Sequence, residues 1–366
     1  MNNTLVMSRF AITLGISSLP LPAWWGGLSL LILGIVVWRL PKWQADTVAD
    51  QVEIRDRAFI EDAHRRTLIQ ALGGLFFLTT AYLSRRNLQI TENQAVTARF
   101  SKAVELLGDN RLEARLGGIY LLERVAKDSP VDHWIVMEVL TSYIRDKSTG
   151  RNSRSSPPTD IQAALTVIGR RETQNDLPGG QLDLSQTNLS QALLMNADLS
   201  HVNLKAANLT KANLEGSHLE GANLAQADLH QVDLSSAHLN RADCSRANFN
   251  QANLFGVNLE SANLLQADLS EAILNKAILI SATLVEANLT QASLVEATLS
   301  NANLIGANLL EANLSAANLT KAELRAAQNL TIEQVQSAAN GAAAIYDPEF
   351  RTQLEAPALE QGSQET

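Results

Sequence analysis

Residues 207–216 read Ala-Asn-Leu-Thr-Lys-Ala-Asn-Leu-Glu-Gly, and the same five-residue pattern continues through residues 182–326. Leucine stands at every fifth position over residues 184–324, except at Cys244 and Phe249. Alanine precedes it by two positions in 23 of the 29 units, and the residue between them is usually Asn or Asp. A repeat this constant has to be explained before any other feature.

A period of five matches neither an α-helix, which repeats every 3.6 residues, nor a flat strand, which repeats every 2. A helix would spread these leucines over all its sides, and a strand would turn them alternately to opposite faces. A solenoid in which each unit turns a corner keeps every leucine on a common axis. The pattern therefore predicts a solenoid with the small residue packed beside the leucine and three positions facing water.

The A-(N/D)-L-x-x unit closely resembles the pentapeptide-repeat proteins, because 29 consecutive units keep the same phase. The resemblance implies a right-handed quadrilateral β-helix with four units, or twenty residues, in each coil. Twenty-nine units would give about seven coils, and both ends would need caps because each coil depends on its neighbours.

Composition limits the classes of function. The 366 residues carry a formal net charge of −9, which does not indicate bulk nucleic-acid binding. The single cysteine, Cys244, excludes an intrachain disulfide, and its inward position predicts a small buried side chain.

Two apolar segments precede the repeats. Residues 11–38 contain no charged residue, and residues 23–40 with their flanks are long enough to cross a bilayer of about 30 Å. Tryptophans near both ends suit the two membrane interfaces. A signal peptide is the alternative, but no small-residue cleavage site follows Trp38.

Residues 67–84 form a second uncharged run between two arginine pairs, and we expect a second span there, although it is short and contains Gly73-Gly74. Residues 39–67 would then be a charged connector, either solvated or at the membrane interface. Its six basic residues alone would place the connector in the cytoplasm and the C-terminal region outside.

Apolar residues at helical spacing predict three helices in residues 91–147, followed by a polar linker at 148–158. Asp160 is expected to cap a fourth helix over residues 161–171, and residues 161–177 should cover the first coil. The expected inward positions of the three helices are Phe100, Val104 and Leu107; Leu116, Ile119, Tyr120, Leu122 and Val125; and Trp134, Ile135, Val139, Leu140, Tyr143 and Ile144.

After the last repeat, Thr331 is expected to cap a short helix, and the chain ends in a polar tail. The side chains expected to cover the last coil are Ile345, Tyr346, Phe350 and Leu354.

Segments outside the repeats resemble bacterial membrane-anchored pentapeptide-repeat proteins, in which a helical segment lies between a transmembrane hairpin and the solenoid. They are Pro41-Lys42-Trp43-Gln44, Arg99-Phe100-Ser101-Lys102-Ala103, Arg115-Leu116-Gly117-Gly118-Ile119-Tyr120, Asp132-His133-Trp134 and Ile161-Gln162-Ala163-Ala164-Leu165. The resemblance implies a two-span bacterial membrane protein with a cytoplasmic repeat domain. We predict a transmembrane hairpin at 1–90, a small all-α domain at 91–180, the β-helix at 181–328 and a capping helix with a polar tail at 329–366.

The sequence contains no catalytic, cofactor-binding or metal-binding motif, so we expect neither an enzyme nor a cofactor. His218 and His238 should stack about 5 Å apart on one face, but the following coil offers Asn258 and no third ligand, so two exposed histidines are the simpler interpretation. We interpret the recurring Asn and Asp residues as solvated positions of the outer faces.

Apolar residues take outward positions in the later repeats. Leu265, Val285 and Ile305 recur every twenty residues and should form a stripe on one face, while Phe255 and Val295 share a column on the opposite face. An exposed apolar stripe usually marks a contact. The contact would be with a protein partner, with a second copy, or with the chain's own C-terminal helix or helical domain.

We therefore predict a membrane-anchored scaffold whose rigid column mediates protein–protein interaction or self-association. The alternative is a DNA-mimicking inhibitor of a topoisomerase-like enzyme, since some pentapeptide-repeat proteins resemble B-form DNA in width and acidity. Residues 181–330 hold 14 acidic and 7 basic side chains, a net charge of −7, so this column is only modestly acidic. An enzyme or a transporter would need a site or a polar lining that the sequence does not show.

Overall fold

A computed structural model describes residues 34–44, 46, 54–148 and 156–355. The chain divides into two compact units, residues 1–93 and residues 94–366. In the first unit, residues 34–44 are helical, and α3 (Ile54–Leu107) begins there and ends in the second unit. Most of the first expected span, residues 23–40, lies outside the described residues.

Helix α3 is the one described helix that is long and apolar enough to cross a membrane, over Phe59–Leu107, and its apolar window is not buried. It merges three segments that the sequence analysis separated: part of the connector, the second expected span and the first helix of the all-α domain. No proline interrupts residues 54–107, and two glycines cost only about 1 kcal/mol each relative to alanine. The expected domain boundary at residue 90 is therefore not a break in the helix, and the two-span hairpin stays a prediction.

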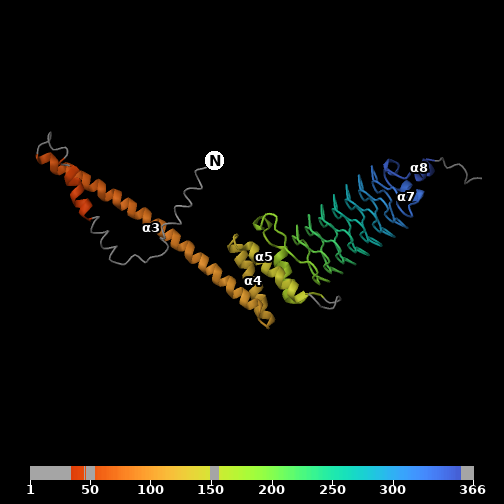
Figure 1. Cartoon of the computed structure of the whole chain (residues 1–366), viewed down its shortest axis with the longest axis horizontal. Helices are drawn as coiled ribbons and strands as arrows, with labels where there is room; N and C mark the ends of the chain where they lie inside the picture. The colour runs from red at the N-terminus through yellow and green to blue at the C-terminus, as the bar shows by residue number, and fades with distance from the viewer. Residues whose placement is uncertain (1–33, 45, 47–53, 149–155, 356–366) are drawn as a thin grey trace, which may run out of the picture. The chain divides into compact units, whose positions relative to one another are not determined.

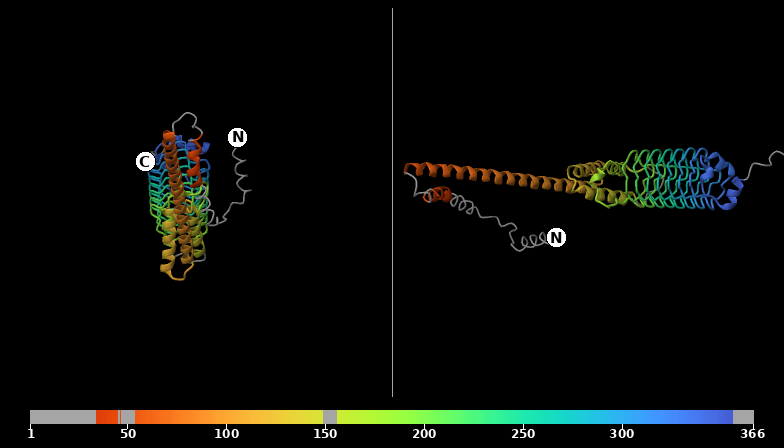
Figure 2. Two further views of the ribbon diagram at one scale, coloured as in Figure 1. Left: turned by 90° about the vertical axis from the view of Figure 1, so that its left-hand side faces the viewer. Right: turned by 90° about the horizontal axis from the view of Figure 1, so that it is seen from above.

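The repeats wind into a column of stacked coils (Figures 1 and 2). Parallel bridges join residues twenty apart, beginning with Asp183 to Asn203 and continuing in every unit to Asn308 and Gln328. The predicted β-helix with four units per coil is confirmed. Each bridge is a single residue long, because the backbone turns a corner before a longer strand can form.

Each corner is a turn closed by a backbone hydrogen bond, such as that from Ala192 N–H to the Leu189 carbonyl at 3.0 Å. The residue two positions after each leucine has a φ between +54° and +69°. Only four of these 29 residues are glycine, so 25 side chains accept the left-handed conformation that usually favours glycine.

The Asn and Asp side chains stabilise these left-handed corners by accepting hydrogen bonds. In the first unit, Asp183 Oδ1 accepts a hydrogen bond from the Ser185 amide at 3.0 Å, which holds the turn, and another from Asn203 Nδ2 of the next coil at 2.9 Å. The same two contacts recur along the column, for example at Asp233 and Asn253. These residues are partly exposed, as expected of outer-face positions, but they also hydrogen-bond within the turn and between coils, which the interpretation as solvated residues did not include.

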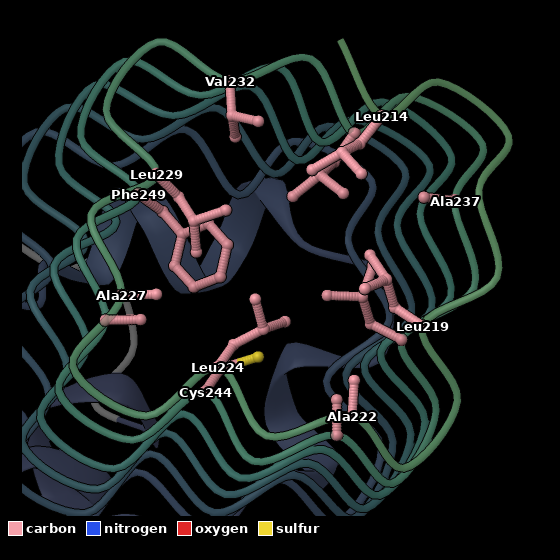
Figure 3. Close-up of a cluster of buried hydrophobic side chains, with 14 of the residues drawn as sticks. Leu214, Leu219, Ala222, Leu224, Ala227, Leu229, Val232, Ala237, Cys244 and Phe249 are labelled. Atoms are coloured by element: carbon pink, nitrogen blue, oxygen red, sulfur yellow. The ribbon is translucent and has the colours of Figure 1, made fainter. Parts of the chain in front are cut away.

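All 29 inward positions are buried, with at most 2% of the residue surface exposed. Figure 3 shows inward side chains of successive coils pointing toward the axis, with Cys244 stacked on Leu224 and Phe249 stacked on Leu229. Burial raises the pKa of the Cys244 thiol well above its ordinary value. The predicted leucine axis and the predicted burial of Cys244 are confirmed.

Three helices precede the column: α4 (Leu112–Asp128), α5 (His133–Ser148) and α6 (Thr159–Gly169), followed by the short 3₁₀ helix η2 (Thr173–Asn175). Their buried residues include most of the predicted inward positions of α4 and α5. Tyr120 and Ile135 are exceptions, being 50% and 49% exposed, because each lies next to a more deeply buried neighbour on its helix.

Asp160 does not cap α6 as predicted, because Pro158 occupies that position. Instead its buried carboxylate accepts hydrogen bonds from Arg115 Nε at 2.7 Å and the Tyr143 hydroxyl at 2.6 Å. Burial would raise the pKa of Asp160, but these two donors outweigh it and hold the pKa below its ordinary value. Asp160 therefore ties α6 to both α4 and α5.

Residues of α6 and the segment after it close the first coil, as predicted. The Gln162 side chain replaces a missing strand: its Oε1 accepts from the Leu193 amide at 3.0 Å and its Nε2 donates to the Leu193 carbonyl at 2.7 Å. The Asp198 amide donates to the Gly169 carbonyl at 2.7 Å. Arg171 donates to the carbonyls of Asp198 and Ser200.

The other end is closed by α7 (Ile332–Ser337), the 3₁₀ helix η3 (Gly341–Ala343) and α8 (Pro348–Glu355), at the blue end of Figure 1. Thr331 caps α7 in a reciprocal capping box with Gln334, as predicted. Tyr346 is buried, and Phe350 and Leu354 pack partly buried against the core. Ile345 is 43% exposed, because its backbone pairs with Glu323 as one more coil position and its side chain points outward.

The adjacent residues Gly117 and Gly118 of α4 should respond oppositely to alanine. A Cβ at Gly118 would lie 2.8 Å from the Ala103 carbonyl oxygen of α3, whereas a Cβ at Gly117 has no neighbour within 4 Å. We expect Gly118→Ala to destabilise by about 1–3 kcal/mol through this clash and Gly117→Ala to stabilise by up to about 1 kcal/mol through helix propensity. Denaturant unfolding of the two variants checks this, and equal shifts would contradict the close packing of α3 on α4.

Candidate interaction surfaces

The predicted stripe is formed by Leu265, Val285 and Ile305, which lie directly above one another. The Gln266 amide donates to the Val285 carbonyl, and the Glu286 amide donates to the Ile305 carbonyl, both at 2.9 Å, so the three residues share one column. All three side chains are half-buried. Before the stripe this column holds Ser185, Lys205, Ala225 and Ser245, and after it Arg325, so large apolar side chains are confined to three coils.

The second apolar group lies on the opposite face. Phe255 is 43% exposed, and the Lys276 ammonium lies 5.9 Å from the centre of its ring. Val295 is half-buried, and its amide donates to the Asn275 side chain, which separates it from Phe255 in their column. Ile273 is 45% exposed on the same face. The two predicted residues therefore belong to a patch rather than to a continuous stripe.

Two exposed apolar residues were missed by the sequence analysis. Ile278 is 37% exposed on the face next to Phe255, and Leu310 is 43% exposed near the C-terminal end. Both stand at outward positions of their units, so the same positional count that found the stripe would have found them.

The helices after the last repeat lie at the end of the column rather than along its side. Gln334 of α7 donates to the Leu309 and Ala312 carbonyls, both at 2.8 Å, and Val335 is buried against the core. The described part of the C-terminal segment thus closes the final coil and leaves Leu265, Val285 and Ile305 half-exposed.

His218 and His238 stack as predicted, with ring centres 5.0 Å apart and planes inclined by 4°. His218 Nδ1 lies 3.2 Å from Glu220 Oε1. No group of three metal-binding side chains occurs among the described residues.

A buried polar cluster that the sequence analysis did not find lies where the helices meet the first coil. Asp176 accepts from Arg171 Nε at 2.9 Å and lies 3.0 Å from His133 Nε2. A cavity of 490 Å³ beside it is lined by Trp134, Arg171, Asp176 and His201, among others. Because Arg171 binds Asp176 and also donates to two backbone carbonyls of the column, we interpret the cluster as part of the cap.

Comparison with known protein families identifies the repeats. Residues 181–216, 217–254, 252–291 and 292–327 match the family described as Pentapeptide repeats (8 copies). A comparison with curated proteins gives no match.

Three solved structures illustrate the likeness. HetL, a pentapeptide repeat protein involved in heterocyst differentiation regulation in the cyanobacterium Nostoc, is 33% identical over 45% of this chain and 73% of its own, with a TM-score of 0.25. A pentapeptide repeat protein of the Arabidopsis thaliana thylakoid lumen is 31% identical over 30% of this chain and 72% of its own, with a TM-score of 0.26. QnrB1, a plasmid-mediated fluoroquinolone resistance protein, is 17% identical over 43% of this chain and 87% of its own, with a TM-score of 0.23.

The repeats, the twenty-residue coil and the match to the family over residues 181–327 lead to one conclusion. The chain belongs to the pentapeptide-repeat proteins, whose repeats form a right-handed β-helix, and it carries a helical region before the repeats.

Proposed function

We propose that this protein is a membrane-anchored scaffold whose column binds a protein partner along the stripe formed by Leu265, Val285 and Ile305. The observation that carries the proposal is a three-coil apolar stripe left half-exposed on a rigid, regular face. Aligned apolar side chains on an otherwise polar surface favour a contact with another molecule. The patch with Phe255, Ile273 and Val295 offers a second contact on the opposite face.

The column is suited to binding because its surface is fixed by many repeated hydrogen bonds rather than by mobile loops. Backbone bonds between coils recur at 2.6–3.1 Å along its whole length. A partner would therefore meet side chains that are already ordered, which lowers the entropy lost on association.

The proposed anchor is a hairpin of two spans, with the second inside α3. The apolar part of α3 includes Leu75, Phe76, Phe77, Leu78 and Tyr82, each more than half exposed. Arginine pairs at 65–66 and 85–86 bracket this segment, which suits a helix whose ends meet lipid headgroups. A reporter fused after Thr366 would test the proposed cytoplasmic position of the repeats.

Val285→Lys tests the stripe, because it places a charge at its centre. Ser245→Lys is the matched control, since Ser245 lies in the same column one coil before Leu265. After cross-linking in intact membranes and purification in detergent, we expect V285K to lose the co-purifying protein by about tenfold or more and S245K to retain it. Unchanged assembly and unchanged stability in V285K would contradict the proposal.

DNA mimicry would require a continuous acidic surface. Here acidic side chains alternate with other groups along the corners, as where Arg246 Nε donates to Gln266 and Gln266 donates to Glu286. Lys276 and Glu296 also pair at 3.7 Å. The distribution of charge thus favours the scaffold, and a DNA supercoiling assay with a topoisomerase would test the alternative directly.

A further inference from the structure

At the C-terminal edge of the column, two backbone N–H groups lack the hydrogen-bond acceptor that the equivalent groups have in the other coils. In a complete coil, the leucine N–H and the N–H two residues later donate to the next coil, as Leu184 does to Asn203 and Gln186 to Lys205. At these positions of the last coil, five amides donate to backbone carbonyls of the segment that follows, namely those of Leu309, Ala316, Leu319, Lys321 and Leu324. The Ala326 amide donates to the Asp347 carboxylate. The amides of Glu311 and Leu314, at the two remaining positions of this described coil, have no acceptor.

Helix α7 explains the two unpaired amides. The bridge from Ser293 to Asn313 is the last one on its face, because the chain forms α7 where the next single-residue bridge would lie. The Gln334 side chain satisfies two carbonyls of the last coil, but the two amides stay free. A groove of 460 Å³ remains between α7 and the final coil, and Glu311 and Leu314 both line it.

The groove has an acidic rim and an apolar side. Its lining includes Glu311 and Glu333 but no lysine, arginine or histidine, and Leu310 beside them is 43% exposed. Hydrogen bonds from the Glu333 backbone amide and the Thr331 hydroxyl lower the pKa of Glu333. Glu333 is therefore negatively charged at neutral pH.

We propose that this groove binds an extended peptide segment of a protein partner that carries a basic side chain. Two backbone carbonyls of the peptide would accept from Glu311 and Leu314, as in the addition of a strand to a sheet edge. The basic side chain would lie between Glu311 and Glu333, and an apolar neighbour would contact Leu310. Complementary charge selects a basic peptide over an acidic one.

This inference deepens the proposed protein-binding role but uses a different surface. The groove lies at the column's end, whereas Val285 lies on a side face two coils before Arg325. Loss of peptide binding in the groove and loss of the partner from the stripe are therefore separate results, and V285K should bind the peptide normally.

The test uses the full chain in detergent and a fluorescent acetyl-Val-Lys-Val-Lys-Val-amide peptide, compared with the same peptide containing Glu in place of Lys. We expect the Lys peptide to bind at least about tenfold more tightly than the Glu peptide and to slow amide hydrogen exchange in residues 309–316. The double variant E311K/E333K should lose this preference. Glu271→Lys is the matched control, because Glu271 occupies the same corner column two coils away and lies outside the groove.

Three results would overturn the proposal. The first is equal weakening by E271K and by E311K/E333K, which would indicate general charge attraction. The second is peptide binding without any change of exchange in residues 309–316. The third is strong protection of these amides before peptide is added, which would show that the chain's own tail or a second copy already fills the groove.

Discussion

Arg171→Met should cost about 3 kcal/mol of folding free energy, because it leaves a partly buried carboxylate and several backbone carbonyls without their cationic donor. The Arg171 side chain is 2% exposed and binds Asp176 at 2.9 Å. It also donates to the carbonyls of Ile168, Asp198 and Ser200. His133 Nε2 lies 3.0 Å from the other oxygen of Asp176, so the substitution removes the donor to one carboxylate oxygen and leaves the contact with the other.

The adjacent Arg170 provides the control. Its side chain is 50% exposed and pairs with Glu123 at 2.6 Å, so Arg170→Met should cost between about 0 and 1 kcal/mol. Denaturant unfolding of both variants in the same detergent would give the comparison. Because each coil depends mainly on its neighbours, amide exchange in R171M should also accelerate in the first coils before the last ones. Similar losses in the two variants would refute the capping role.

The column could be predicted from sequence because one repeated requirement determines it. Every inward position from residue 184 to residue 324 must be apolar, and a spacing of five allows only a winding that turns at each unit. The stacking of His218 on His238 followed from the same arithmetic, since a coil of twenty residues places them on neighbouring turns.

The ends of the column could not be predicted in the same way, because each capping contact occurs once. Nothing in the sequence around Gln162 shows that its amide will pair with Leu193, thirty-one residues later. The residue type and position of Asp160 predict a helix cap, but Arg115 and Tyr143, far away in sequence, donate to its carboxylate. Such pairs depend on the finished packing of α4, α5 and α6.

The outer faces of the column could be predicted only in part. Counting positions identified Leu265, Val285 and Ile305 as neighbours, and the structure places them in one column. The same counting did not show what the Asn and Asp residues do, because their second hydrogen bond joins two coils. Nor could it find the groove beside Leu314, which exists only because α7 forms where a further coil position would lie.

Replacing Phe249 with alanine should produce the largest loss within the column, about 3–5 kcal/mol, because it removes a fully buried aromatic ring from a closed core. Phe249 is the only inward position larger than leucine, and Cys244 on the adjacent side of the same coil is the only one smaller. Both side chains project toward the axis in Figure 3. We infer that the small thiol leaves the room that the ring occupies.

A double-mutant cycle tests this compensation. Cys244→Leu should overpack the coil and Phe249→Leu should leave a void, each costing about 1–3 kcal/mol. The double variant C244L/F249L restores the leucine pair found in the other coils, so it should be within about 1 kcal/mol of the original protein and the two losses should not add. Leu269→Phe, which places a ring in the same column next to Leu264 rather than next to a cysteine, should be destabilising on its own. Additive losses in C244L/F249L, measured by denaturant unfolding, would show that the two residues occupy independent space and that the coil tolerates the ring by another route.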